Sequence, residues 1–139
     1  MQYKTIGNTI VARLEIGEEI IASVEDICGK EKIKSGVIHA IGAVSSAEIA
    51  MFDFKKGEYC SNNLDEFMEL ISLEGNISKM NGETYIHLHA SFGDKDGKVF
   101  GGHLKKAVIG ATCEMFVTPL DEEIVRIHDE KTGLNIFSL

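Results

Sequence analysis

The sequence predicts an α+β fold, in which a mostly antiparallel β-sheet carries one main helix. Three observations predict it. Residues 84–92 alternate between polar and apolar side chains, the period-two pattern of a strand with one buried face. Residues 20–28 instead repeat apolar side chains at helical spacing. Short apolar runs separated by glycine, asparagine and aspartate turns fill most of the remaining chain.

The first part of the chain is predicted to hold two strands and the helix. The strands are expected at residues 3–6 and 9–14, on either side of a Gly-Asn turn. A Gly-Glu-Glu segment at 17–19 is expected to open the helix, because acidic residues are favourable in a first helical turn. The helix is expected to end at Gly29 or at the lysines near it. Its apolar stripe consists of Ile20, Ile21, Val24, Ile27 and Cys28.

Strands are predicted to follow one another through the rest of the chain. An Asn-Gly turn is expected to lead into the strand at 84–92. Pro119 is expected to end the strand at 106–117. Glycine inside a strand, as at Gly101, Gly102 and Gly110, indicates a bulge or the close approach of another backbone or a ligand. The other strands are expected at residues 36–41, 47–54, 67–77 with a break at Gly75, 106–117, 123–128 and 135–138.

Three histidines lie within seventeen residues: His87 and His89 in His-Leu-His, and His103 at the end of Gly-Gly-His. The strand at 84–92 is followed by Asp-Lys-Asp-Gly, a strong turn signal. Gly97 suits the left-handed position of a three-residue hairpin loop that ends in a glycine bulge. A strand-turn-strand interpretation therefore brings the three imidazoles into one hairpin.

The register of this hairpin decides whether the histidines meet. If Asp94 pairs with Lys98, then His89 lies opposite His103, with their Cβ atoms about 5 Å apart. His87 shares that face because it is two residues from His89 along the strand. A slip of two residues would place His87 opposite His103 and keep the cluster. A slip of one residue would send His103 to the other face.

Three neutral imidazoles at this separation can bind one divalent ion at about 2.0–2.1 Å per nitrogen. Three protein ligands leave a fourth position for water, a substrate or a neighbouring side chain. Zinc is the first candidate, although imidazole also suits copper, nickel and iron. The alternative interpretation is a polar strand face with solvated histidines. We favour a metal site.

Length and composition fit one domain over residues 1–139. The net charge is −8, which argues against direct binding of DNA, because such binding begins with the neutralisation of phosphates. The three cysteines, Cys28, Cys60 and Cys113, are far apart and odd in number, which indicates free buried thiols in a reducing compartment. The chain shows no signal peptide and no apolar run near 18 residues. We therefore expect a cytoplasmic protein without membrane spans.

Several short motifs follow one another in a specific order along nearly the whole chain. They are Val-Ala-Arg-Leu at 11–14, Gly-Glu-Glu-Ile at 17–20, Ile-Gly-Ala-Val at 41–44, Glu-Gly-Asn-Ile-Ser at 74–78, His-Leu-His at 87–89, Asp-Lys-Asp-Gly at 94–97, Gly-Gly-His at 101–103, Gly-Ala-Thr at 110–112 with Glu114, and Thr-Gly-Leu at 132–134. With them the chain resembles the stand-alone prokaryotic form of the plants-and-prokaryotes-conserved (PPC) domain, which also occurs behind AT-hooks in plant nuclear proteins.

The resemblance implies a compact α+β fold that assembles as a homotrimer. It also implies a metal, zinc in some prokaryotic members, held by the residues that match here as His87, His89 and His103. Plant members commonly lack these histidines, so the fold does not require the metal. The family is often labelled DNA-binding because of its plant relatives, but this chain contains no Arg-Gly-Arg-Pro AT-hook. The resemblance leaves the role of the stand-alone proteins open.

Five further residues are candidates for parts of a site. His39 lies in an apolar stretch and is interpreted as a core or interface histidine, and His128, beside two acids, as a surface residue. Glu48 and Glu114 lie in apolar stretches, where each could orient a ligand histidine or act as a general base. The alternative for Glu114 is a solvent-facing position, which we favour. Arg13 either pairs with a carboxylate at a subunit contact or is exposed.

Three functions are compatible with these features. The first, which we favour, is a trimeric, metal-containing binding or regulatory module for a small molecule or a protein. The second is a zinc-dependent enzyme in which the three-histidine site activates water; it predicts an open coordination position in a cleft, with an acid within reach. The third is a DNA-associated protein, which the charge disfavours unless a partner supplies the basic surface.

Overall fold

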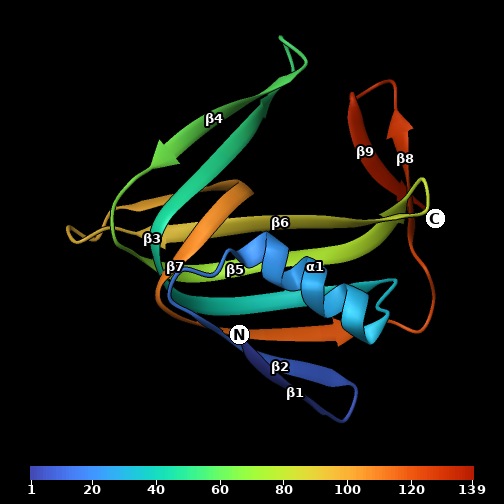
Figure 1. The fold of residues 1–139 in the computed structure, drawn as a ribbon. Coiled ribbons are helices and arrows are strands. Elements are labelled where there is room, and N and C mark those ends of the chain that lie inside the picture. Colours follow the sequence, from blue (N-terminus) through green and yellow to red (C-terminus); the bar gives the residue numbers. More distant parts are fainter.

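The structure is a computed structural model that describes all 139 residues (Figure 1). It has the predicted α+β class: strands form one nine-stranded sheet, and a single helix packs on it. The elements in chain order are β1 (Gln2–Ile6), β2 (Thr9–Glu15), α1 (Ile20–Glu31), β3 (Gly36–Asp53), β4 (Glu58–Leu64), β5 (Met68–Met80), β6 (Glu83–Gly93), β7 (Val99–Pro119), β8 (Val125–Asp129) and β9 (Leu134–Ser138).

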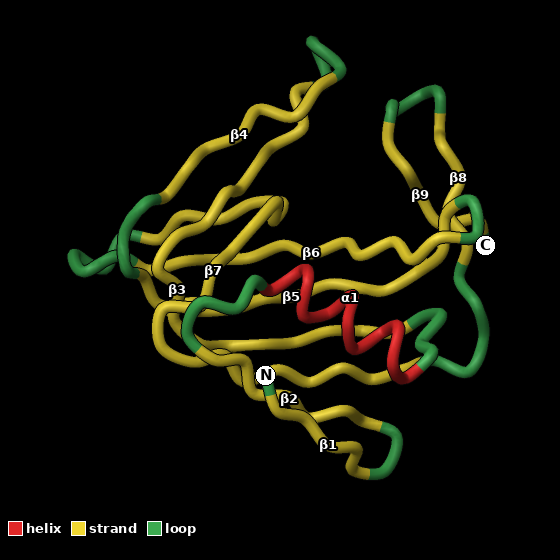
Figure 2. The backbone as a smooth tube through the Cα atoms, in the orientation of Figure 1, coloured by secondary structure: helices red, strands yellow, loops and turns green.

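The sheet closes on itself through four strands. Its main order is β1-β2-β7-β3-β5-β8-β9, and β6 pairs with both β5 and β7. Because β3 also pairs with β5 and β7, the strands β3, β5, β6 and β7 form a closed ring. All pairings are antiparallel except the one between β5 and β8. Two hairpins, β3–β4 and β8–β9, extend from this ring (Figure 2).

Helix α1 begins after a side-chain cap and ends before a residue with left-handed backbone conformation. The Glu19 carboxylate accepts hydrogen bonds from the backbone N–H of Ala22 at 2.8 Å and of Ala107 at 3.1 Å, so it caps the helix and ties it to β7. The helix passes Gly29 and ends before Lys32, which takes a left-handed φ of 55°. Two positions are expected for the end of the helix, Gly29 and the nearby lysines, and the helix ends at the lysines. The buried face consists of Ile20, Ser23, Val24, Ile27 and Cys28.

Strands β3 and β7 are longer than the sequence predicts. The strands expected at 36–41 and 47–54 are one continuous β3, and the second strand of the predicted histidine hairpin joins the strand expected at 106–117 in one continuous β7. The register between β3 and β7 shifts three times, twice near residues 42–46. Irregular pairing lets a strand bend without ending. Residues 42–46, which separate the two strands expected in this region, are therefore part of one bent strand.

The glycines inside β7 mark the close approach of neighbouring strands. A Cβ at Gly102 would lie 2.8 Å from the oxygen of Ala50, and one at Gly110 would lie 2.8 Å from the nitrogen of Ser45. A Cβ at Gly101 would lie 3.0 Å from a backbone oxygen of β6. The register shift opposite Gly110 also confirms the bulge interpretation there. Within the chain, backbone approaches closely at all three positions, and at Gly110 the Phe67 side chain also lies 2.9 Å from the built Cβ.

Gly75 does not break β5, as the sequence led us to expect, but lets β6 approach it. A Cβ there would lie 2.1 Å from the oxygen of His87 and 2.9 Å from the Cα of Leu88. We therefore expect Gly75→Ala to lower the free energy of unfolding by about 3 kcal/mol, and the melting temperature by roughly 10 °C. Thermal unfolding followed by circular dichroism measures this.

A matched glycine provides the control for this prediction. Gly29 lies in α1, and a Cβ at this position would have no neighbouring atom within 4 Å. Because alanine is the better helix former, Gly29→Ala should raise the free energy of unfolding by up to about 1 kcal/mol. Equal melting temperatures of the Gly75 variant and the wild type would show that β5 and β6 can separate at this point.

Strand β4 is absent from the sequence prediction. Its seven residues are exposed or half-buried, and four of them are Glu, Ser, Asn and Asn, which are not strand formers. Its order comes from seven consecutive pairings with β3. β8 and β9, by contrast, begin within two residues of the predicted starts.

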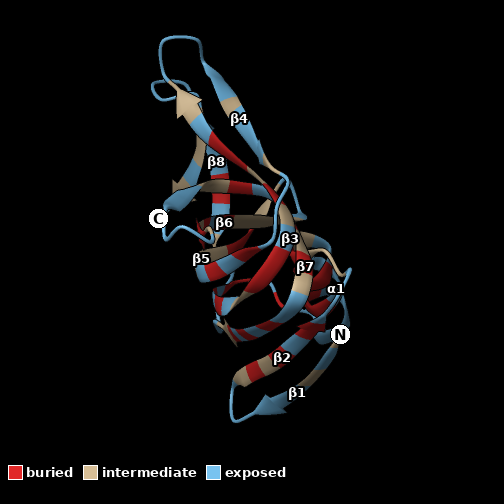
Figure 3. Ribbon diagram, turned by 90° about the vertical axis from the view of Figure 1, so that its left-hand side faces the viewer, coloured by how far each residue is buried: buried red, intermediate tan, exposed pale blue.

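Strand β6 separates the core from the histidine face. Leu88, Ala90 and Phe92 are buried in the main hydrophobic cluster. His87 and His89, which alternate with these residues, point away from it. Figure 3 shows the same alternation of buried and exposed residues along the neighbouring strands. The predicted alternation is therefore confirmed, and it places the histidines on the face opposite the core.

The three cysteines are free in the structure. Cys28 and Cys113 are buried as predicted, whereas Cys60 on β4 is only half-buried. Burial raises the pKa of the Cys28 thiol to about 11 and that of Cys113 to about 12. Both are therefore protonated and poorly nucleophilic at neutral pH. A reducing, cytoplasmic location stays a prediction. With twelve residues, α1 is too short to cross a membrane, and the fold contains no other helix.

Candidate metal centre

The predicted register of the histidine hairpin is confirmed. His89 on β6 lies directly opposite His103 on β7. The backbone N–H of Asp94 donates to the oxygen of Lys98 at 2.9 Å, and Gly97 takes a φ of 77° in the loop. Neither a slip of one residue nor a slip of two occurs.

The three imidazoles converge as the register requires. The ring centroid of His87 lies 5.1 Å from that of His89 and 5.1 Å from that of His103, and the remaining pair is 5.5 Å apart. One ring nitrogen of each residue lies within 4.8 Å of the other two. No other group of three His, Cys, Asp or Glu side chains in the structure meets this condition. The chain thus contains one compact three-histidine cluster.

Two of these histidines are held neutral by their surroundings. Burial, followed by the charge of Arg126, lowers the pKa of His87 to about 4. Burial, followed by His87 and Lys105, lowers the pKa of His103 to about 4 as well. At neutral pH both rings therefore carry a lone pair, the form in which imidazole binds a metal.

His103 has a nitrogen that no protein group satisfies. Its Nδ1 atom is buried and has no hydrogen-bond partner. The ring is held by Tyr59 of β4, whose centroid lies 4.9 Å away at an interplanar angle of 32°. Buried polar atoms nearly always have a partner, so an orphaned ring nitrogen beside two other imidazoles fits a bound ion. The residues present therefore suit a divalent metal.

Arg126 of β8 supports His87, and no pattern in the sequence indicates this role. The guanidinium donates to Ser78 Oγ at 2.8 Å, Asn76 Oδ1 at 2.8 Å and the Asn135 oxygen at 2.6 Å. Its Nη2 atom lies 3.3 Å from His87 Nδ1. The C-terminal hairpin therefore reaches the histidine cluster through one buried cation.

Aromatic side chains and the opposite hairpin complete these surroundings. The Arg126 guanidinium carbon lies 4.8 Å from the ring centroid of Tyr85 and 4.4 Å from that of Phe137. At the β8–β9 turn, a Cβ built on Gly133 would lie 3.5 Å from Phe52 Cζ. The hairpins β8–β9 and β3–β4 therefore approach each other, and each contributes a residue that contacts a histidine.

A carboxylate lies across from His89. Glu74 of β5 is its cross-strand partner, and both help line a hollow of about 230 Å³ with Ser72 and Ser91. Glu74 Oε2 is 2.6 Å from Nδ1 of His39, whose side chain is 59% exposed. His39 is therefore not a core residue, and its alternative role as an interface histidine stays a prediction.

The remaining candidates lie outside the cluster. His128 and Glu114 are exposed, as predicted, and Glu48 is half-buried. Neither glutamate belongs to the group of potential metal ligands. Arg13 is exposed, with its guanidinium 3.2 Å from the Glu15 carboxylate on the same strand. Glu74, missed by sequence reasoning, is thus better placed than Glu48 or Glu114.

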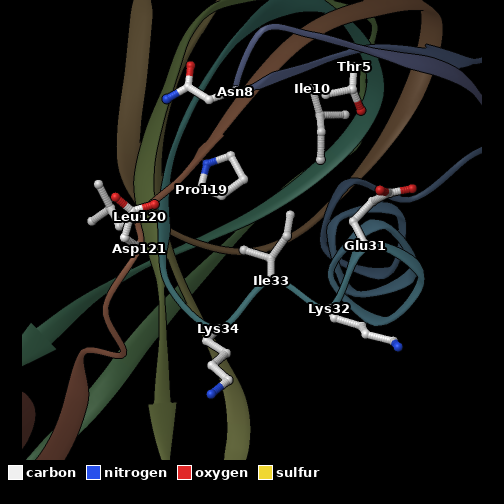
Figure 4. Close-up of a pocket in the computed structure, with 10 residues that line it drawn as sticks. All are labelled: Thr5, Asn8, Ile10, Glu31, Lys32, Ile33, Lys34, Pro119, Leu120 and Asp121. Carbon is white, nitrogen blue, oxygen red and sulfur yellow. The ribbon is translucent and has the colours of Figure 1, made fainter.

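A second hollow of about 470 Å³ lies beside the end of α1 (Figure 4). Ile10, Ile33 and Pro119 line its centre, while the side chains of Lys32 and Lys34 extend away from it. None of the three histidines lines this hollow. It therefore offers no route to the candidate metal centre.

A family model matches residues 1–121 of the 139, and its description is the Plants and Prokaryotes Conserved (PCC) domain. The chain belongs to this family. It is the same family that the sequence motifs resemble, and PPC and PCC are two abbreviations of its name. The matched residues include all three histidines of the cluster but not Arg126.

Three solved structures share nearly the whole fold of this chain. A metal-containing protein of Archaeoglobus fulgidus is 37% identical, with a TM-score of 0.89, and the match covers 100% of this chain and 99% of that one. A candidate DNA-binding protein of Bacteroides thetaiotaomicron is 34% identical, with a TM-score of 0.95 over 99% and 96% of the two chains. A PPC protein of Pyrococcus horikoshii is 33% identical, with a TM-score of 0.87 over 99% and 95%.

Curated relatives of this PCC domain are much longer proteins. Two of them are called bifunctional protein GlmU, from Synechococcus strains, and are 27% identical over 124 residues. The alignment covers 87% of this chain but only 19% and 18% of those proteins. The chain therefore spans about a fifth of the length of the curated relatives it matches.

Proposed function

We propose that the protein is a trimeric, metal-containing binding or regulatory module, whose divalent ion is held by His87, His89 and His103. The observation that carries this proposal is the convergence of three imidazoles, each with a ring nitrogen within 4.8 Å of the others. Elemental analysis of protein purified without chelators tests it, and about one divalent ion per chain is expected. Zinc is the first candidate, because three histidines with an open fourth position are a common zinc environment.

An apolar surface that the chain leaves uncovered supports the proposed trimer. Val37 and Ile41 on β3 and Phe116 on β7 are exposed large side chains on the face opposite the core. A hollow of about 560 Å³ lined by Ile41, Phe67 and Ile71 continues this surface. Apolar side chains at the centre of a sheet commonly mark a protein interface. We define the outer face as Val37, Ile41 and Phe116, and propose that it contacts other copies of the chain.

The histidine cluster lies on the same side of the sheet as the outer face. Cross-strand neighbours connect the two: Phe116 lies opposite His39, His39 opposite Glu74, and Glu74 opposite His89. A copy of the chain bound to the outer face would therefore border the metal centre. This arrangement supports a module in which assembly and ligand binding occur at neighbouring sites.

A zinc-dependent enzyme is the second candidate, and one observation favours it. The Glu74 carboxylate lines a hollow beside His89, which supplies the acid within reach that an enzyme requires. A metal held by the three histidines would supply Lewis-acid chemistry for water, and Glu74 would be the candidate base because it lines the same hollow as His89. Faster hydrolysis of an activated ester by the metal-loaded wild type than by His89→Ala protein would favour this candidate over the first.

We also infer that residues 1–139 form one domain, although the family match ends at residue 121. The hydrogen bonds of Arg126 support this, because they join the C-terminal hairpin to Asn76 and Ser78 of β5. A hairpin on its own is at best marginally stable in water. The C-terminal hairpin should therefore unfold together with the rest of the chain.

The structural relative described as a candidate DNA-binding protein raises the question of DNA binding here. We expect no retardation of a DNA duplex by the purified protein at physiological salt, because a net charge of −8 opposes binding to phosphates. A gel-shift titration measures this, with a basic DNA-binding protein as the positive control. Retardation that disappears steeply with rising salt would contradict the prediction and identify a local basic surface.

A further inference from the structure

The buried arginine beside the histidine cluster has no acidic partner. Arg126 is 6% exposed, and its hydrogen-bond acceptors, Ser78, Asn76 and Asn135, are all neutral. It takes part in none of the ion pairs of the structure. Buried charges are normally compensated by a charge of opposite sign, because their removal from water is costly. The charge of Arg126 is therefore met within the chain by neutral acceptors and by the rings of Tyr85 and Phe137, and by no acidic group.

A second cation lies on the other side of the cluster. The Lys105 ammonium is 4.3 Å from the ring centroid of Tyr59, and that ring stacks on His103. Arg126 lies 3.3 Å from His87. Two of the three histidines therefore have a cation nearby, His87 through a direct contact with Arg126 and His103 through the ring of Tyr59. A divalent ion would add to this positive potential.

One carboxylate, that of Glu74, shares a hollow with His89. Glu74 lines the hollow beside His89, but its Oε2 atom is engaged by His39 at 2.6 Å, and its side chain is 59% exposed. Solvent therefore screens much of its charge. The histidines themselves bring no negative charge, so Glu74 alone does not balance the ion and the two cations.

We propose that the metal centre takes a small anionic ligand, a molecule that carries a carboxylate or a phosphate group. The ion would bind its charged oxygen, and the positive charges of Arg126 and Lys105 would stabilise it. Because the N–H groups of Arg126 are directed to protein acceptors, the arginine acts through its charge and through its hold on His87. This inference rests on the proposed metal site and adds the ligand class.

The test uses full-length protein loaded with Co²⁺, whose visible absorption reports its coordination. Acetate and inorganic phosphate are titrated at constant ionic strength, with acetamide as a neutral isostere. Saturable spectral changes with acetate or phosphate, and none with acetamide, are expected. If Co²⁺ does not bind, the proposed function fails and the ligand class falls with it. Bound Co²⁺ with a spectrum that no anion changes overturns this inference alone.

Charge-neutralising variants locate the source of the anion preference. Arg126→Gln should raise the dissociation constant for acetate about tenfold, measured at a Co²⁺ concentration that keeps the site loaded despite the lost contact with His87. Because this buried residue also supports the fold, Lys105→Gln at an exposed position is the second variant, with an expected increase of about threefold. Lys106→Gln, the same charge change one residue along β7, is the control. Equal dissociation constants for the Lys105 and Lys106 variants and the wild type would overturn the assigned role of the cations.

Discussion

Replacement of His89 by alanine should reduce the metal content from about one ion per chain to near zero after gel filtration. His89 is one of the three imidazoles whose ring nitrogens lie within 4.8 Å of one another, so its replacement removes one of the three proposed ligands. Loss of residues that merely orient a ligand already costs ten- to a hundredfold in metal affinity, so the loss of a ligand itself should cost about a hundredfold or more. Elemental analysis of the purified variant measures the change.

The control for this prediction is His128→Ala, which removes an exposed histidine outside the cluster. It should retain the metal of the wild type. His89 is exposed too, so its variant should keep the far-ultraviolet circular dichroism of the folded chain. Equal metal content in the two variants would remove the three-histidine site from consideration.

Replacement of Phe116 by glutamate should convert a trimer into single chains. Phe116 is 48% exposed at the centre of the outer face, between Val11 and His39 on the neighbouring strands. Burial of such a side chain contributes about 1.5–3 kcal/mol, and closure of a trimer would bury three copies. A glutamate there would have to lose its hydration at each contact. Light scattering should show the mass fall from about three times 15.3 kDa to about 15.3 kDa.

Leu139→Glu is the matched control, because it places the same charge on an exposed apolar residue at the end of the chain. Its mass should equal that of the wild type. A wild-type mass near 15.3 kDa would refute the trimer itself. A trimer that persists in the Phe116 variant would place the subunit contact on another surface.

The helix and the histidine hairpin could be predicted because short-range patterns determine them. The apolar stripe of α1 and the alternation in β6 each express one buried face, and Gly97 identifies the loop that sets the register. The pairing of His89 with His103 follows from a count over fifteen residues, with no knowledge of the rest of the sheet.

The parts that were missed depend on partners far away in the sequence. β4 has no apolar face of its own and is ordered by its pairing with β3. Gly75 is an example of the same limit, because its role depends on how closely His87 approaches it. Arg126 reaches Ser78 across 48 residues and His87 across 39, and neither contact leaves a local pattern. The surroundings that tune the site are therefore visible only in the folded chain.

The closed ring of strands has a consequence for the order in which the chain folds. Its long-range seam between β3 and β7 joins residues as distant as Gly36 and Pro119, and such contacts are slow to form because large loops must close first. The histidines, by contrast, lie within seventeen residues on one hairpin, and hairpins form within about 1–10 μs. An ion could therefore find its ligands before the ring is complete. In that order of events, an ion bound at the proposed site would influence the yield of folded protein.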